Sequence, residues 1–188
     1  MPPRIVALGD SLTSGHGIGA AAAFPAVLQQ KIDADGFDYT VVNAGVSRDT
    51  SAQAVERLDR ALEGDVRILI VALGANDGLR GVPVRQLEQN LTRIVETAQA
   101  RRIAVVLCGM EALPIYGWTY TTEFHDVYVD LARAYKLTLV PFIMMNIFGN
   151  PSLMLPDRVH PNANGARAIA EVIWPYLLPL LTRIRTTR

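Results

Sequence analysis

The sequence predicts an α/β domain in which helices cover both faces of a parallel sheet. Short runs rich in β-branched residues alternate with longer amphipathic segments along the chain, a pattern typical of βαβ units. The run at 66–73 is continuously apolar, as expected for a central strand buried on both faces. The chain has 188 residues and half of them are apolar, so we expect residues 1–188 to form a single domain with a sizeable core.

The elements of this domain follow one another in a regular order. The predicted strands are 4–8, 39–43, 66–73, 103–107 and 137–140. Helical patterns occupy the segments between them, at 24–34, 55–62, 87–98 and 124–135, and a last helix starts near residue 161. Pro25 fits the first helical turn, where its missing N–H is not needed. Pro175 and Pro179 are expected to kink or shorten the last helix. Right-handed crossovers then give a parallel sheet.

Composition excludes several classes of protein. There are 18 basic and 18 acidic residues, and this zero net charge argues against a nucleic-acid-binding protein or one that holds an anionic membrane. No apolar run reaches the roughly 18 residues of a membrane span, so we expect no stable membrane insertion. No signal peptide is recognisable, which leaves the compartment open. The single cysteine, Cys108, lies in an apolar run and is expected to be a buried, unreactive side chain.

Four clusters of small and polar residues follow the predicted strands. The segments 9–13, 43–47 and 74–78 come directly after the first three strands, and 157–161 follows the fifth strand beyond a long loop. Ligands of open parallel sheets bind outside the carboxyl ends of the strands. We therefore expect these four segments to meet in one pocket.

Asp157 and His160 form the strongest pair within these clusters. A carboxylate three residues before a histidine can bind Nδ1–H and leave Nε2 free as a base. An aspartate that caps the last helix beside an incidental histidine explains the pair equally well. Ser11 follows the first strand, and its hydroxyl becomes a nucleophile only if a base such as His160 reaches it. By itself Ser11 is better explained as a capping or turn serine.

Three groups can act as donors to an oxyanion. Asn76 offers a side-chain amide, Gly45 offers an unobstructed backbone N–H, and Ser11 offers its own N–H. Asn76 and Gly45 taken singly could be mere turn residues. Together with Ser11, His160 and Asp157 they complete the set that acyl transfer needs.

The remaining polar residues have simpler interpretations. Asp10 and Asp77 are expected to stiffen their turns by accepting backbone hydrogen bonds. His16 and His125 are expected to be surface or satisfied, partly buried histidines. With so few histidines and cysteines, and none at ligand spacing, we expect no metal site and no cofactor.

The four clusters, taken in order, resemble the conserved blocks of the SGNH (GDSL) hydrolases. This resemblance implies a three-layer α/β/α sandwich with a flavodoxin-like, five-stranded parallel sheet. It implies Ser11 as nucleophile, His160 as base and Asp157 as the orienting acid, with an oxyanion hole formed by Ser11, Gly45 and Asn76. Segments 114–117 and 140–142 look most like those of the bacterial thioesterase/lysophospholipase and arylesterase group. The implied activity is hydrolysis of small carboxylic esters, with acyl thioesters and lysophospholipids as further substrates.

An acyl chain needs an apolar groove beside the serine. The residues expected to bind substrate are Leu12, Leu113, Pro114, Ile115 and Tyr116. The run 142–145 is a second candidate for the groove, although a core position is favoured for Phe142 and Ile143. The sequence leaves the acyl chain length and the oligomeric state open.

Three other functions compete with this interpretation. A carbohydrate O-deacetylase of the same family would use the same residues. A catalytically inactive binding domain is not favoured, because every expected catalytic position is occupied. A flavin- or nucleotide-binding domain is suggested by 15–20, which formally matches G-x-G-x-x-G/A. However, that match lies well beyond the first strand, and Pro25 interrupts the helix that should begin there.

Overall fold

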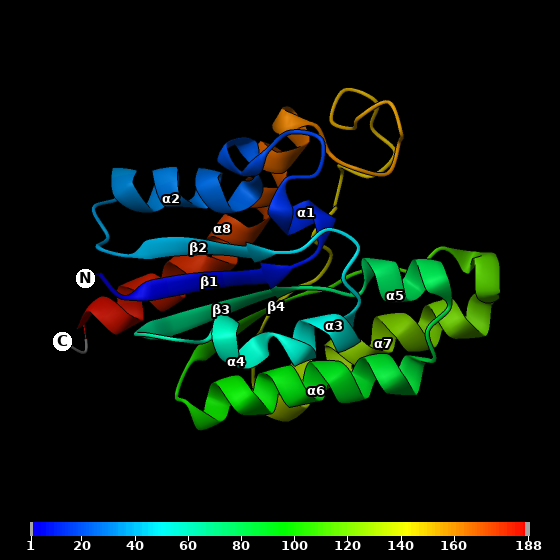
Figure 1. Ribbon diagram of the computed structural model, residues 1–188, viewed down its shortest axis with the longest axis horizontal. Coiled ribbons are helices and arrows are strands. Elements are labelled where there is room, and N and C mark those ends of the chain that lie inside the picture. The colour runs from blue at the N-terminus through cyan, green and yellow to red at the C-terminus, as the bar shows by residue number, and fades with distance from the viewer. Residues whose placement is uncertain (1, 187–188) are drawn as a thin grey trace.

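One parallel five-stranded sheet forms the centre of the protein (Figure 1). The computed structural model describes residues 2–186. The strands pair in the order β2-β1-β3-β4-β5, and every pairing is parallel. Their bounds are β1 (Arg4–Gly9), β2 (Thr40–Gly45), β3 (Val66–Ala72), β4 (Ala104–Cys108) and β5 (Thr138–Val140). This order is the flavodoxin-like one, so the expected α/β fold is confirmed.

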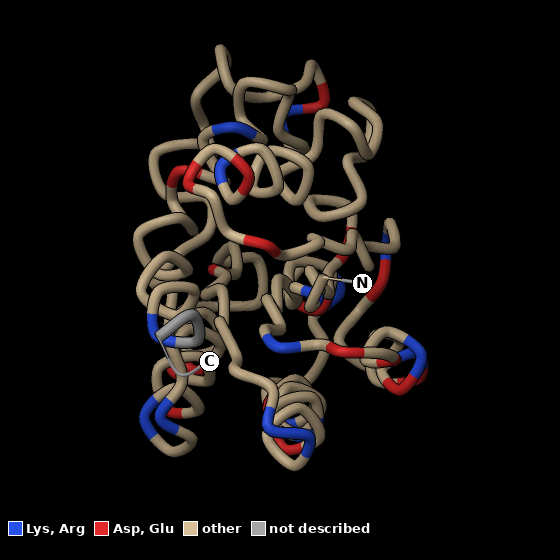
Figure 2. The backbone as a smooth tube through the Cα atoms, turned by 90° about the vertical axis from the view of Figure 1, so that its left-hand side faces the viewer, with Lys and Arg blue, Asp and Glu red and all other residues tan. Residues whose placement is uncertain are grey.

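Helices cover both faces of the sheet and complete three layers (Figure 1). One face carries α2 (Phe24–Ala34) and α8 (Ala163–Thr186), and the other carries α3 (Ser51–Glu56), α4 (Leu58–Ala61), α6 (Val84–Ala100) and α7 (Trp118–Tyr135). Shorter helices lie in the connections: α1 (Ser11–Ser14), α5 (Ala75–Arg80) and the 3₁₀ turns η1 (Ala20–Ala22) and η2 (Pro114–Tyr116). Basic and acidic residues are interspersed along the backbone (Figure 2), in keeping with the zero net charge.

The strand register brings the polar connections together. Gly9, the last residue of β1, pairs with Gly45 of β2 and with Ala72 of β3. The neighbouring strands β2, β1 and β3 therefore end at the same level. The residues that follow them leave the sheet side by side at its carboxyl edge, at the point where the strand order reverses.

The predicted apolar faces are buried as expected. Residues Ile68 to Ala72 of β3 are fully buried, because both faces of this central strand are covered. On α6 the buried positions recur every three or four residues and form one stripe against the sheet. These positions are Leu87, Leu91, Ile94, Val95 and Ala98.

The helices differ from their predicted bounds in three places. The pattern at 55–62 is not one helix, because α3 and α4 are separated at Arg57. Helix α7 begins at Trp118, six residues before its predicted start. Helix α8 begins at Ala163 and runs through both Pro175 and Pro179, so the expected shortening is wrong. Burial of its apolar face outweighs the backbone hydrogen bonds that the two prolines remove.

Within residues 2–186, no helix combines the length and the apolar character needed to cross a bilayer.

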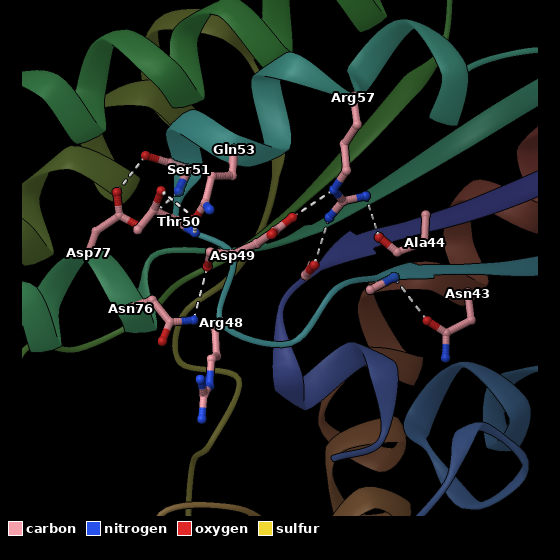
Figure 3. A network of polar contacts seen from close by, with 12 residues as sticks. Asn43, Ala44, Arg48, Asp49, Thr50, Ser51, Gln53, Arg57, Asn76 and Asp77 are labelled. Carbon is pink, nitrogen blue, oxygen red and sulfur yellow. Dashed lines mark hydrogen bonds and ion pairs between the residues drawn. The ribbon is translucent and has the colours of Figure 1, made fainter.

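The break at Arg57 has a structural cause (Figure 3). Arg57 leaves the helical conformation, and its guanidinium turns toward the carboxyl edge of the sheet. It donates hydrogen bonds to the carbonyl of Gly9 at 3.0 Å and to the carbonyl of Ala44 at 2.8 Å. A third bond joins its Nε to Asp49 Oδ2 at 2.7 Å. One side chain thus ties the ends of β1 and β2 to the loop that precedes α3.

We expect Arg57→Met to lower the free energy of unfolding by about 2–4 kcal/mol, because the nearly buried carboxylate of Asp49 and the carbonyl of Ala44 lose the guanidinium, and the carbonyl of Gly9 keeps only the N–H of Val46. Urea denaturation measures this loss. Arg133→Met is the control, since Arg133 forms only an exposed pair with Asp130 on α7. The control should cost at most about 1 kcal/mol, and equal losses in the two variants would contradict the role given to Arg57.

Candidate active site

A cavity of about 850 Å³ opens at the carboxyl edge of the sheet. It lies beside the ends of β1 and β3, where ligands of this topology bind. Its walls include residues that follow all five strands. The predicted site residues among them are Ser11, Leu12, Asn76, Leu113, Asp157 and His160.

Ser11, His160 and Asp157 form a continuous chain of contacts in this cavity. His160 Nε2 lies 3.1 Å from Ser11 Oγ, and His160 Nδ1 lies 2.7 Å from Asp157 Oδ2. Ser11 and His160 are 149 residues apart in the sequence, so only the fold brings them together. A hydroxyl with a base at hydrogen-bond distance, oriented in turn by a carboxylate, has the geometry of an activated nucleophile.

The environment of Asp157 keeps this carboxylate charged. Asp157 Oδ1 accepts the backbone N–H groups of His160 at 3.0 Å and Val159 at 2.9 Å. These bonds lower the pKa of Asp157 well below its ordinary value. The backbone N–H of His160 contributes most, followed by the His160 imidazole and the backbone N–H of Val159. An ionised Asp157 accepts Nδ1–H and leaves Nε2 of His160 facing the serine.

The structural alternatives for these residues do not match the observed contacts. Asn162 caps α8, since its Oδ1 accepts the backbone N–H groups of Asn164 and Gly165 at 2.9 and 3.0 Å. Asp157 is therefore not the cap of the last helix. Helix α1 is capped by Asp10, whose side chain accepts the N–H of Leu12 at 3.0 Å. The hydroxyl of Ser11 is consequently not a capping group.

Asp77 is a buried structural carboxylate next to the site, as predicted. It is fully buried, and it accepts the backbone N–H of Ser51 at 2.9 Å and the Ser51 hydroxyl at 2.5 Å. Asn76 next to it donates one amide hydrogen to the carbonyl of Asp49 at 2.9 Å (Figure 3). The two residues join the loop after β3 to the loop before α3.

The oxyanion donors are only partly where the sequence predicts them. The amide of Asn76 lines the cavity and keeps a second hydrogen beyond the one it gives to Asp49. The N–H of Gly45, in contrast, is donated to Asn43 Oδ1 at 3.0 Å (Figure 3), and Gly45 is not among the cavity-lining residues. The role of Gly45 as an oxyanion donor stays a prediction, and in this structure its N–H is already bonded within its own loop.

Arg48 offers a backbone donor in its place. It lines the cavity, and among the described residues its N–H has no hydrogen-bond acceptor. The loop turns at this residue, which has a φ of 72°. The sequence contains no signal for such a donor, because every residue except proline carries a backbone N–H.

The predicted substrate-binding residues divide into two groups. Leu12 and Leu113 line the cavity. Pro114, Ile115 and Tyr116 do not line it. They form the 3₁₀ turn η2, in which the Tyr116 hydroxyl donates to the carbonyl of Leu79 at 3.1 Å.

The run 142–145 alternates between the cavity and the interior. Phe142 and Met144 line the cavity, whereas Ile143 is fully buried in the core. A core position, which the sequence favoured for both Phe142 and Ile143, is thus correct for Ile143, whereas Phe142 is partly buried, packs against the core and also lines the cavity.

His16 is a surface histidine, as predicted, but its position on the cavity wall was not expected. Its ring centroid lies 4.3 Å from that of His160, and ligand atoms of His16, Asp157 and His160 all lie within 4.8 Å of one another. These three could hold a metal ion. A metal bound there would compete with the contacts that join Asp157, His160 and Ser11. The expected absence of a metal site stays a prediction.

Two other expectations concern residues outside the reacting groups. His125 is exposed, and its Nδ1 lies 2.7 Å from Glu111 Oε1. Cys108 is fully buried, and burial raises the pKa of its thiol to about 12. Both side chains are as predicted, a surface histidine and an unreactive thiol.

Comparison with known proteins supports a hydrolase. The GDSL-like Lipase/Acylhydrolase family matches residues 7–168. Esterase TesA of Pseudomonas aeruginosa is 37% identical over 178 residues, which are 94% of this chain and 89% of that protein. Thioesterase 1/protease 1/lysophospholipase L1 of Escherichia coli K12 is 36% identical, with 94% and 84% covered. The crystal structure of TesA superposes with a TM-score of 0.89 at 36% identity, covering 94% of this chain and 99% of that one.

The pKa of Asp10 is shifted in the opposite direction to that of Asp157, because Asp10 is buried and Asp157 is not. It is fully buried, and its Oδ2 has no hydrogen-bond partner within the described chain. Burial raises the pKa of Asp10 from 3.8 to about 7, opposed by the Leu12 N–H bond and reinforced by the charge of Asp77. Between these two pKa values the unfolded chain releases a proton that the folded chain keeps. The free energy of unfolding must therefore fall as the pH rises through this window.

We expect Asp10→Asn to remove this fall, because the amide oxygen still caps Leu12 and carries no charge. The stability of the variant relative to wild type should increase from about pH 4 to about pH 7, approaching roughly 1.4 kcal/mol per pH unit. Urea denaturation across this range measures the difference. Asp38→Asn, at an exposed carboxylate, is the control. A stability difference between Asp10→Asn and wild type that does not change with pH would refute the assignment.

Proposed function

Since the chain belongs to the GDSL-like lipase/acylhydrolase family, the SGNH hydrolases, and is an ester hydrolase, we propose that Ser11, His160 and Asp157 are its catalytic triad. The observation that carries this proposal is the contact chain from Ser11 Oγ to His160 Nε2 at 3.1 Å and from His160 Nδ1 to Asp157 Oδ2 at 2.7 Å. It lies inside the apolar-walled cavity at the carboxyl edge of the sheet.

The proposed reaction is a two-step acyl transfer. His160 Nε2 takes the proton of Ser11 as Oγ attacks the ester carbonyl, and the imidazolium that forms is stabilised by ionised Asp157. His160 then gives the proton to the leaving alcohol or thiol as the tetrahedral intermediate collapses to an acyl-enzyme. Water, deprotonated by the same nitrogen, releases the acid in the second step.

The negative charge of the tetrahedral intermediate needs preorganised donors. We assign this role to the N–H of Ser11, the side-chain amide of Asn76 and the N–H of Arg48. The assignment of Arg48 in place of Gly45 is supported by its position on the cavity wall and by its unoccupied N–H. The Gly45 N–H is already bonded to Asn43.

The cavity supports small-molecule substrates with an apolar acyl chain. Leu79, Met110, Leu113, Phe142 and Met144 contribute apolar surface to its walls. Its volume of about 850 Å³ is far larger than an acetyl group requires. Esters with an acyl chain longer than acetyl are therefore proposed as substrates in preference to acetylated carbohydrates. Acyl thioesters and lysophospholipids are included because the E. coli relative is named for both activities.

We expect Ser11→Ala to lower kcat on p-nitrophenyl esters by about 10⁴–10⁶-fold, because no other group replaces the nucleophile. Rates on esters from acetyl to long acyl chains would be compared in wild type and variant. Ser14→Ala is the matched control, since Ser14 lies on the same short helix but bonds Ser47 and does not line the cavity. Turnover of the Ser11 variant equal to that of the control would reject the triad. A strong preference for acetyl esters would favour the deacetylase.

We expect Asn76→Ala to lower kcat by roughly 10²–10³-fold with KM little changed, as loss of an oxyanion donor does. Thermal unfolding of the variant checks that the lost bond to Asp49 has not disrupted the fold. A crystal structure of a phosphonate adduct of Ser11 then identifies the backbone donor. The phosphonyl oxygen should lie within hydrogen-bond distance of Arg48 N. Contact with Gly45 N instead would restore the donor that the sequence predicts.

A further inference from the structure

Three arginines line the proposed active-site cavity. They are Arg48, Arg80 and Arg158. All three are exposed, and within residues 2–186 none forms an ion pair with a carboxylate. The cavity also contains Glu111 and Asp157, but each of these is held at 2.7 Å by a histidine. Three guanidinium groups therefore outnumber the two carboxylates on the cavity wall, and among the described residues neither carboxylate pairs with an arginine.

The backbone at Arg48 and Arg158 is also unusual. Their φ angles are 72° and 58°, in the left-handed region that costs a non-glycine residue roughly 1 kcal/mol. Three other non-glycine residues share this conformation, each with a local reason. Arg102 and Lys136 follow the carboxyl ends of α6 and α7, where a cation is favourable. Asn146 is a residue type that tolerates this region.

Neither cavity position follows the carboxyl end of a helix. Each lies in a loop turn, closed by the hydrogen bond from the Asp49 N–H to the Val46 carbonyl at 3.1 Å and by that from the Arg158 N–H to the Leu155 carbonyl at 2.9 Å. Arg48 lies before the start of α3, and Arg158 lies in the loop that leads to α8. At the amino-terminal side of a helix a cation is unfavourable rather than favourable. A residue that strains the backbone beside a site usually does so for the function of that site. Both of these residues are arginines, and both line the same cavity.

We propose that Arg48 and Arg158 bind an anionic group of the substrate, so that this hydrolase favours esters that carry a phosphate or carboxylate near the scissile bond. The inference rests on the proposed function of the same cavity. Arg48 lies in the loop after β2, and Arg158 lies between Asp157 and His160, so the two reach the cavity that contains Ser11 from separate loops. The planar guanidinium suits bidentate binding of either anion.

Arg80 has a positioning role in this arrangement. One of its guanidinium nitrogens donates to the backbone carbonyl of Arg48 at 2.9 Å. It thereby helps to hold the left-handed turn at Arg48, which lines the cavity.

The test uses two substrate pairs that differ only in an anionic group. p-Nitrophenyl pentanoate and p-nitrophenyl hydrogen glutarate place the charge on the acyl part. 1-Hexanoylglycerol and its 3-phosphate place it on the alcohol part. We expect wild type to have the higher kcat/KM on the anionic member of at least one pair. The pair that shows this preference tells which part of the substrate meets the arginines. The preference should decrease at high ionic strength, because exposed charges are screened.

Glycine substitutions at Arg48 and Arg158 separate the contribution of the guanidinium group from that of the left-handed backbone conformation. Arg48→Gly and Arg158→Gly remove the guanidinium and relieve the strained φ, so folding is retained. Each should reduce the preference for the anionic substrate by roughly three- to tenfold, mainly through KM. Arg102→Gly is the matched control, since it is an arginine of the same conformation that does not line the cavity. Its preference should equal that of wild type.

The outcomes distinguish this inference from the function on which it rests. Hydrolysis of neutral esters without an anionic preference in wild type would overturn the inference and leave the esterase intact. So would a preference that survives in both cavity variants or is lost equally in Arg102→Gly. If wild type hydrolyses none of the four substrates, the proposed function is overturned as well.

Discussion

The guanidinium of Arg57 is the constraint on which the site depends. It binds the carbonyl of Gly9 at the end of β1, the carbonyl of Ala44 next to the end of β2, and the carboxylate of Asp49 at once. Parallel strands end with unpaired carbonyls, and these need donors when they are removed from water. By meeting that need, Arg57 fixes the level at which the loops carrying Ser11 and Arg48 leave the sheet. Asn76 extends the same network through Asp49, so the proposed nucleophile and oxyanion donors share one rigid support.

Three carboxylates at this edge are used in three different ways. Backbone N–H groups and an imidazole keep the exposed Asp157 charged and ready to orient His160. Burial without a second partner makes Asp10 resist ionisation while it caps α1. Asp77 is also fully buried, but Ser51 supplies two hydrogen bonds to it. The same chemical group is therefore a charged orienting group, a cap or a structural anchor according to its donors and its solvation.

The elements of the fold could be predicted where burial leaves a periodic pattern. The strands and the long helices are recognisable because one face or both faces meet the core, and α6 shows this most clearly. Helices α1 and α5 are too short to display a period, and the break at Arg57 is caused by partners on distant strands. The shortening of α8 expected at Pro175 and Pro179 was wrong because tertiary burial, not local propensity, decides the length of that helix.

The sequence by itself determined the fold class and the likeness of four segments to a hydrolase family, because side-chain type and periodicity are local properties. It also pointed to Ser11, Asn76, Asp157 and His160, which the structure brings to one cavity. Only the tertiary structure showed that the Gly45 N–H is already occupied and that Arg48, His16 and Arg158 face the same cavity. Hydrogen-bond partners, and proximity between loops far apart in the chain, are properties of the folded molecule, and no local pattern encodes them.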